Sequence, residues 1–69
     1  MKYNFKFGDL FTNGDIILFY IFKIEYDKYR KMNYYYFRHL SNNSESYLAE
    51  CELNNELKRR KFKYYPVKE

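Results

Sequence analysis

The 69-residue sequence contains no Trp, one Pro, one Cys, one His and two Gly. A single cysteine excludes an intrachain disulfide, so the chain lacks the crosslinks on which many small secreted domains depend. One Cys and one His do not make a tetrahedral zinc site without acidic ligands, and no Gly-rich phosphate loop is present. We therefore predict no metal and no cofactor.

Long apolar runs are also absent. The longest, Ile16–Phe22, has seven residues, whereas a transmembrane helix needs about 20. The first residues alternate polar and apolar side chains and show no readable signal peptide. We predict one cytoplasmic domain over residues 1–69, with no membrane partner.

Aromatic residues are abundant instead, with ten Tyr and seven Phe. Each ring removes roughly 150 to 250 Å² from water when it is buried. A domain of this size hides only about 60% of the surface that its unfolded chain exposes, so large core side chains are what it needs to be stable. The composition predicts a small core built mainly from rings.

Alternation of side chains predicts the first strands. Aromatic residues at odd positions alternate with polar ones in Lys2–Phe7, which is the pattern of a strand buried on one side. Gly8 interrupts the pattern and indicates a bulge or bend before a short continuation at Leu10–Thr12. Asn13 and Gly14 then predict a two-residue hairpin turn, because both tolerate positive φ.

The densest aromatic block follows this turn, in a strand predicted from Asp15 to Tyr26. Its even positions are all apolar or aromatic, so we expect them to face the core. The odd positions change from apolar to charged at Lys23. The first half of the strand is therefore expected to be buried on both faces and the second half on one.

A third strand is predicted over Met32–Leu40. The four aromatic residues at 34–37 are consecutive, so two of them must face outward. Ser41–Ser44 contains only Ser and Asn, which predicts a turn.

The composition of Ser44–Lys61 fits two structures. Acids precede bases, which suits the dipole of one long helix. The apolar residues do not form a narrow helical stripe, however, and alternation favours a strand to about Cys51. We predict that strand, one helical turn at Leu53–Lys58 and a last strand at Phe62–Tyr65, which Pro66 ends.

These elements predict a mainly β fold, a small antiparallel five-stranded barrel with one short helical turn near the C-terminus. The motifs Phe5-Lys6-Phe7-Gly8-Asp9-Leu10-Phe11, Asn13-Gly14-Asp15 and Glu52-Leu53-Asn54-Asn55-Glu56-Leu57 resemble Src-homology-3-like barrels among small phage and mobile-element accessory proteins. The resemblance implies the barrel fold and a viral origin. That family also includes nucleic-acid-binding and peptide-binding members.

Catalytic groups are not evident. A nucleophilic Cys51 needs a base such as His39 within hydrogen-bond reach, but a free cysteine in a strand is more often a core residue. Asp9 and Asp15 flank the first hairpin, where Asp is ordinary turn chemistry. Alternating glutamates near position 50 are typical of a solvated strand face. We predict that the protein is not an enzyme.

The best candidate for a functional surface combines tyrosines with the basic run that follows an acidic stretch. Tyr and Arg are enriched in protein interfaces, and cations with exposed rings also bind phosphates and bases. The alternative is a charged exterior that only keeps the domain soluble. The candidate partner-binding residues are Tyr34, Tyr36, Arg38, Lys58, Arg59, Arg60, Lys61, Lys63 and Tyr65.

The first functional hypothesis is a phage-type stoichiometric protein that inhibits a host nucleic-acid-handling defence system, of anti-CRISPR or anti-restriction type. The alternative is a nucleic-acid-binding module that uses the basic and tyrosine-bearing surface. The net charge of +4 favours acidic partners in general. A Cys51 enzyme is the third hypothesis, and the protein is expected to be a monomer or a dimer.

Overall fold

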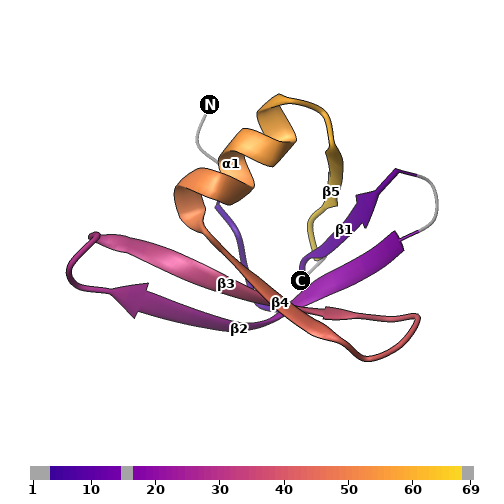
Figure 1. Cartoon of the computed structure of the whole chain (residues 1–69), viewed down its shortest axis with the longest axis horizontal. Helices are drawn as coiled ribbons and strands as arrows, with labels where there is room; N and C mark the ends of the chain where they lie inside the picture. Colours follow the sequence, from indigo (N-terminus) through magenta and orange to yellow (C-terminus); the bar gives the residue numbers. More distant parts are fainter. Residues whose placement is uncertain (1–3, 15–16, 68–69) are drawn as a thin grey trace.

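A computed structural model of the chain describes residues 4–14 and 17–67. Its five strands form one antiparallel sheet in the order β4-β3-β2-β1-β5 (Figure 1). The predicted mainly β fold is confirmed. The elements are β1 Leu10–Asn13, β2 Ile17–Asp27, β3 Met32–His39, β4 Glu45–Ala49, α1 Glu50–Lys58 and β5 Phe62–Tyr65.

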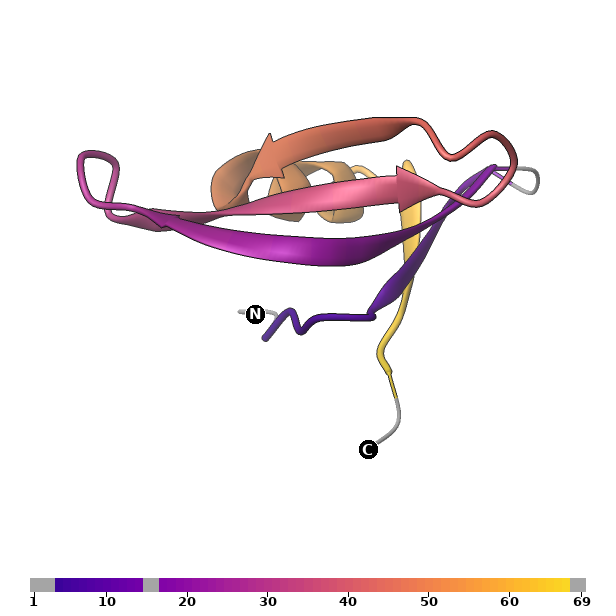
Figure 2. The ribbon, with the colours of Figure 1, turned by 90° about the horizontal axis from the view of Figure 1, so that it is seen from below.

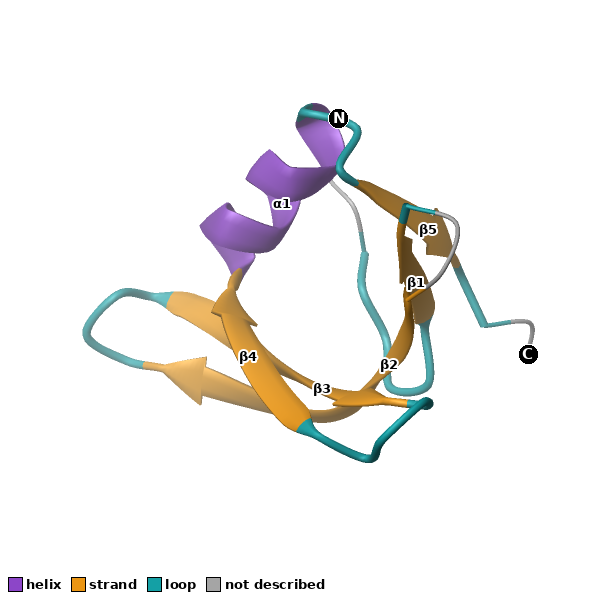
Figure 3. Cartoon of the chain, turned by 45° about the vertical axis from the view of Figure 1, so that its right-hand side comes forward, coloured by secondary structure: helices purple, strands orange, loops and turns teal. Residues whose placement is uncertain are grey.

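The sheet is strongly curled but does not close into the barrel that was predicted. Its edge strands in the described residues are β4 and β5, which do not pair with each other. Helix α1 connects them along the chain and lies across the opening (Figure 3), where it contacts β3, β4 and β5. In the view from below (Figure 2), the described residues that precede β1 run alongside β2, and Gly8 N donates to Ile21 O of β2.

A bulge in β2 changes which side chains face the core. Ile21 pairs with Phe37 and Lys23 pairs with Tyr36, so Phe22 is an extra residue in the ladder. A bulge of this kind moves all later side chains of the strand to the opposite face. Before the bulge, the odd-numbered side chains of β2 therefore face the core, and Phe19 and Ile21 are buried.

The prediction that the even positions of β2 form the core face is wrong for this first half. Leu18 is 41% exposed, and Tyr20 and Phe22 are half-buried on the outer face. After the bulge, Ile24 and Tyr26 share the inner face, but they are exposed because the β2–β3 hairpin extends past the core (Figure 1). Ile16, which was also expected to face the core, lies outside the described residues.

The N-terminal segment is not the strand predicted over residues 2–7, in the part that the structure describes. Asn4–Lys6 is irregular and Phe7 begins a turn, with Phe5 buried and Phe7 67% exposed. Gly8 has φ 90°, a value that a side-chain-bearing residue rarely adopts. Its N–H donates to Ile21 O at 2.8 Å, which places the bend beside β2.

The hairpin predicted at Asn13 and Gly14 is confirmed, but not its two-residue loop. Asn13 is the last residue of β1 and pairs with Ile17, so three residues connect the strands. Gly14 has φ 68°, as the turn requires. The next two residues lie outside the described part of the chain.

Helix α1 begins at Glu50, earlier than predicted, and replaces the end of the expected strand. The Glu52 side chain accepts a hydrogen bond from Ala49 N at 2.9 Å and thereby caps the first turn. Leu53 and Leu57, one turn apart, are the buried residues of the helix. In the sequence, other apolar residues just before α1 and in its first turn obscured the stripe formed by Leu53 and Leu57. Those residues do not lie on the buried face of the helix.

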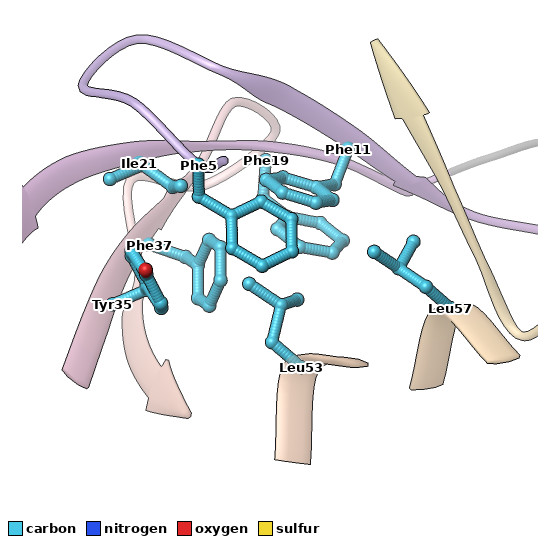
Figure 4. Packing of buried hydrophobic residues seen from close by; sticks show 8 residues of the cluster. All are labelled: Phe5, Phe11, Phe19, Ile21, Tyr35, Phe37, Leu53 and Leu57. Atoms are coloured by element: carbon cyan, nitrogen blue, oxygen red, sulfur yellow. The ribbon is translucent and has the colours of Figure 1, made fainter. Parts of the chain in front are cut away.

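The core is a cluster of rings closed by α1 (Figure 4). Phe11 stacks on Phe19 with centroids 5.7 Å apart, and Phe37 meets both rings edge-on. Edge-to-face pairs add about 0.5 to 1.5 kcal/mol beyond the area that they bury. The buried cluster contains Phe5, Phe11, Phe19, Ile21, Tyr35, Phe37, Leu53 and Leu57.

Candidate interaction surface

The outer face of the sheet carries a continuous group of rings. Phe22, Tyr34, Tyr36 and Tyr47 form this outer aromatic face, on β2, β3 and β4. Tyr47 lies 6.2 Å from Tyr34 and 5.6 Å from Tyr36, centroid to centroid, and Phe22 lies 6.5 Å from Tyr36. Tyr47 is 62% exposed, whereas the other three are half-buried. These rings are outside the core and in contact with solvent.

The alternation of β3 explains this arrangement. Tyr35 and Phe37 are buried, and Tyr34 and Tyr36 therefore point outward. This confirms that two of the four consecutive aromatic residues face out. Register then places Tyr47 directly opposite Tyr36.

Two of the cations beside this face are paired with a glutamate, and a third, Arg30, donates from Nη1 to the Tyr34 hydroxyl at 2.8 Å. Lys23 Nζ lies 3.1 Å from Glu25 Oε2, and Arg38 Nη2 lies 2.9 Å from Glu45 Oε2. The hydrogen bond to its glutamate is the main reason that the pKa of each of these two cations is raised. Lys23 Nζ also lies 5.1 Å from the centre of the Tyr36 ring.

Arg38 stacks on the same group of rings, with its guanidinium carbon 4.5 Å from the Phe22 centroid. The ring quadrupole attracts the guanidinium to the face of the ring. The outer aromatic face therefore combines rings with two balanced charge pairs and one further cation, Arg30.

Of the candidate residues, the structure brings together Tyr34, Tyr36 and Arg38, all on the outer face of β3. The basic run lies elsewhere. Lys58 ends α1, and Arg59, Arg60 and Lys61 form the turn into β5. Among the described residues, these four cations form no salt bridge.

Lys63 and Tyr65 lie on β5, where they pair with Thr12 and Leu10 of β1. Leu10 pairs in turn with Tyr20, and Tyr20 pairs with Arg38. Tyr65 is thus in the same row as Arg38, three strand spacings or about 14 Å away along the curved sheet. One row of the outer face links two parts of the candidate site.

Sequence reasoning missed Phe22, Lys23 and Tyr47 as members of this surface. The bulge that turns Lys23 outward leaves no mark in the sequence, because no Gly or Pro accompanies it. Tyr47 had a readable signal, since it is a tyrosine in a predicted strand. Its position beside Tyr36 depends on the β3–β4 register.

A groove lies at the end of the β2–β3 hairpin, next to the outer aromatic face. This hairpin groove has a volume of about 380 Å³ and shares Tyr34 and Tyr36 with that face. Asp27 Oδ1 accepts from Tyr29 N at 2.9 Å and Arg30 N at 3.4 Å, which fixes the turn. The lining residues are Glu25, Tyr26, Asp27, Lys28, Tyr29, Tyr34 and Tyr36.

Cys51 is exposed in the first turn of α1, so the prediction that it is a core residue is wrong. The helix directs Leu53 inward and leaves Cys51 on the outside. His39 lies at the other end of β3 from Tyr34, whose partner Ala49 precedes the helix. His39 and Tyr34 are five residues apart, about 17 Å along the strand. The structure does not bring Cys51 and His39 together.

Asp9 is completely buried rather than a simple turn residue. Its Oδ2 accepts from Lys6 N at 2.8 Å and from the Tyr64 hydroxyl at 2.7 Å, and its Oδ1 accepts from Val67 N at 2.9 Å. Burial, followed by this hydrogen bond to Asp9, raises the pKa of Tyr64 well above its ordinary value. The carboxylate is therefore a structural anchor. The other residue of its predicted pair, Asp15, lies outside the described residues.

Within residues 4–14 and 17–67, no three His, Cys, Asp or Glu side chains are grouped to hold a metal ion. No helix in that part of the chain has the length and apolar character to cross a membrane. The observed features define a small, mainly β domain with an aromatic outer face. Comparison with known proteins finds no matching family model, no similar curated protein and no similar solved structure.

Proposed function

We propose that this protein is a small stoichiometric binding protein that docks on a larger protein through its outer aromatic face. The observation that carries the proposal is the chemistry of that face. Tyr and Phe rings are in contact with solvent there, and two of the cations beside them, Lys23 and Arg38, are bound to glutamates. Aromatic residues and Arg are enriched at protein interfaces and their hot spots. A phosphate-binding surface would instead present unpaired cations.

The target class that we propose is a host nucleic-acid-handling defence protein, of CRISPR or restriction type, reached in the host cytoplasm. This part of the proposal depends on the resemblance of the sequence to Src-homology-3-like accessory proteins of phages and mobile elements. A domain of 8.8 kDa with no proposed catalytic set acts by occupying a site on its target. Inhibition is then expected to require equimolar protein.

The test is capture from host lysate with the wild type and two variants. Replacing both Tyr36 and Tyr47 by Thr removes two neighbouring rings of the outer aromatic face and keeps residues that favour strands. We expect this double variant to lose the captured protein at least tenfold, because interface rings contribute about 2 kcal/mol or more each at hot spots. The matched control is Phe7→Thr, which removes a ring exposed elsewhere and should retain capture.

Quantitative mass spectrometry of the captured complex should give one target at a ratio near one to one. Capture of the same protein by the wild type and the double variant alike would contradict the proposal. Inhibition of the target at far below equimolar protein would contradict a stoichiometric mechanism.

A second candidate function is nucleic-acid binding, favoured by the basic turn Lys58–Lys61. Its side chains form no salt bridge among the described residues and are exposed. Titration with single- and double-stranded oligonucleotides at two salt concentrations tests this function. Binding that falls steeply as salt rises and weakens in Lys58→Ser and Lys61→Ser would support it.

A further inference from the structure

The turn that follows β1 contains an asparagine with an unusual neighbour. Asn13 is the last residue of β1, Gly14 follows it, and both residues are exposed. Of the seven asparagines in the chain, Asn13 is the one that precedes a glycine. The side chain of an asparagine can be attacked by the backbone nitrogen of the next residue, and glycine hinders this attack least because it has no side chain.

The structure leaves the attacking nitrogen free. Within residues 4–14 and 17–67, Gly14 N donates no hydrogen bond and the Asn13 side chain forms none. The space beside Gly14 is open, because no described atom outside the adjacent residues lies within 4 Å of the position that a Cβ would take. Gly14 N can therefore turn toward the carbonyl carbon of the Asn13 side chain without breaking a hydrogen bond of its own.

The turn at Ser41–Ser44 has the opposite arrangement. Asn42 and Asn43 are also exposed, but the nitrogen that would attack each of them is engaged. Asn43 N donates to His39 O at 2.9 Å, and Ser44 N donates to Asn42 Oδ1 at 3.0 Å. Exposure in a turn is thus shared by three asparagines, whereas a free attacking nitrogen distinguishes Asn13 from the other two.

Regular structure or bulk protects the remaining asparagines. Asn54 and Asn55 lie in α1, where backbone nitrogens are held in hydrogen bonds to the preceding turn. Asn33 precedes a tyrosine in β3 and Asn4 precedes a phenylalanine, so a bulky side chain hinders attack at both positions. Sequence and fold together single out Asn13.

We infer that Asn13 is a site of spontaneous deamidation. Gly14 N gives up its proton to the solvent and forms a bond to Asn13 Cγ. The bond from Cγ to Nδ2 breaks, and the nitrogen takes up a proton and leaves as ammonia. The resulting five-membered succinimide ring is opened by water at either carbonyl, which gives aspartate or isoaspartate at position 13. Water is the co-reactant, and the inference is independent of the proposed function.

The product changes the first hairpin in charge and in length. Either acid adds one negative charge, so the formal net charge of +4 falls by one. Isoaspartate also directs the main chain through its side-chain carbon, which lengthens the backbone by one atom. Asn13 pairs with Ile17 of β2 and with Phe62 of β5. The change therefore affects the last pair of β1 in both ladders.

The test is incubation of the folded protein at 37 °C and pH 8, followed by tryptic digestion and mass spectrometry. Cleavage after Lys6 and Lys23 gives a peptide in which Asn13 is the only asparagine. Cleavage after Arg38 and Lys58 gives a reference peptide that contains the asparagines of the second turn and of α1. We expect the Asn13 peptide to convert to the acid at least tenfold faster than the reference peptide, and to give two products that reversed-phase chromatography separates.

The pH and a variant check the chemistry. Conversion should be slower at pH 6 than at pH 8, because the attacking nitrogen must lose its proton. Asn13→Gln should abolish it, because a glutamine side chain has to close a six-membered ring, which forms far more slowly.

The same protein unfolded in guanidinium chloride gives the rate without tertiary structure. Conversion of Asn13 in the folded protein within about tenfold of this rate would support the inference. Conversion in the unfolded protein alone would overturn it, because the fold would then protect Asn13. Equal conversion of the two peptides in the folded protein, or conversion of neither, would also overturn it.

Discussion

Asp9 connects parts of the chain that are far apart in sequence. It accepts hydrogen bonds from Lys6 near the N-terminus, from Tyr64 of β5 and from Val67 beyond that strand. Its own backbone oxygen accepts from Ile21 N of β2 at 3.0 Å. A buried carboxylate is tolerated only where such donors replace water. Asp9 therefore fixes the segments at Lys6 and Val67 against the sheet.

Replacing Asp9 by Ala should lower the free energy of unfolding by about 3 kcal/mol, because three partly buried donors lose their acceptor. Tyr64→Phe removes one of these bonds and should cost about 1 kcal/mol. Urea denaturation followed by circular dichroism measures both values. Equal stability of Asp9→Ala and the wild type would contradict the anchoring role.

The raised pKa of Tyr64 predicts a loss of stability at alkaline pH. Its ordinary value is 10.0, so below that pH the hydroxyl keeps its proton in both the folded and the unfolded state. Above it the unfolded chain loses the proton first, and the free energy of unfolding falls as pH rises toward the raised value. Burial raises the pKa of Tyr35 in the same direction.

Denaturant titrations between pH 9 and pH 11.5 test this linkage. The decline should be smaller in Tyr64→Phe than in the wild type. Tyr29→Phe is the control, since the Tyr29 side chain is 98% exposed and its loss should leave the slope unchanged. An identical slope in all three proteins would show that Tyr64 does not contribute.

At the scale of elements, α1 ends in a Schellman motif that lacks the usual glycine. Lys61 N donates to Glu56 O at 3.0 Å, and Arg60 N donates to Leu57 O at 3.1 Å. Arg60 adopts φ 60°, the left-handed conformation that glycine normally provides at this position. The helix end therefore contains a local strain.

Arg60→Gly should raise the free energy of unfolding by about 0.5 to 1 kcal/mol, because glycine adopts this φ without steric cost. The gain is limited by the greater freedom of glycine in the unfolded chain. Thermal unfolding gives the sign directly. Arg59→Gly is the matched control: Arg59 has φ −79°, so glycine there should destabilise. A lower melting temperature for Arg60→Gly would contradict this interpretation of the helix end.

The β2 bulge is the second decisive local feature. It leaves Phe22 as an unpaired extra residue on the outer face and places Lys23 opposite Tyr36 on that same face. Without it, the side chains beyond Ile21 would continue the earlier alternation, and Lys23 and Glu25 would point to the inner face. The ion pair between Lys23 and Glu25 on the outer face depends on this single extra residue.

At the scale of the whole molecule, the curled sheet and α1 enclose one side and leave the other in solvent. Rings are divided between the two sides. The inner side holds the core cluster, and the outer side holds the four rings of the outer aromatic face. A larger domain would have more interior for such rings, whereas a chain of this size has a high ratio of surface to volume. The rings of the outer aromatic face therefore stay in contact with solvent.

Much of this architecture was predictable from local sequence. Alternation predicted β3 and showed that half of its aromatic residues face out, and turn residues predicted the first hairpin. The helix start was missed because Ala49 offers no capping side chain, and Cys51 was misplaced with it. Of the candidate site, Tyr34, Tyr36 and Arg38 were predicted together, whereas the basic run could not be positioned because its place depends on where α1 ends.

The sequence by itself determined a mainly β chain with a core of rings and a surplus of tyrosine, because side-chain alternation and aromatic content act within each segment. The tertiary structure decided which rings are buried, where Asp9 lies, and that the sheet stays open under a helix. These features depend on strand register, one bulge and contacts between residues up to 58 positions apart, which no local pattern encodes.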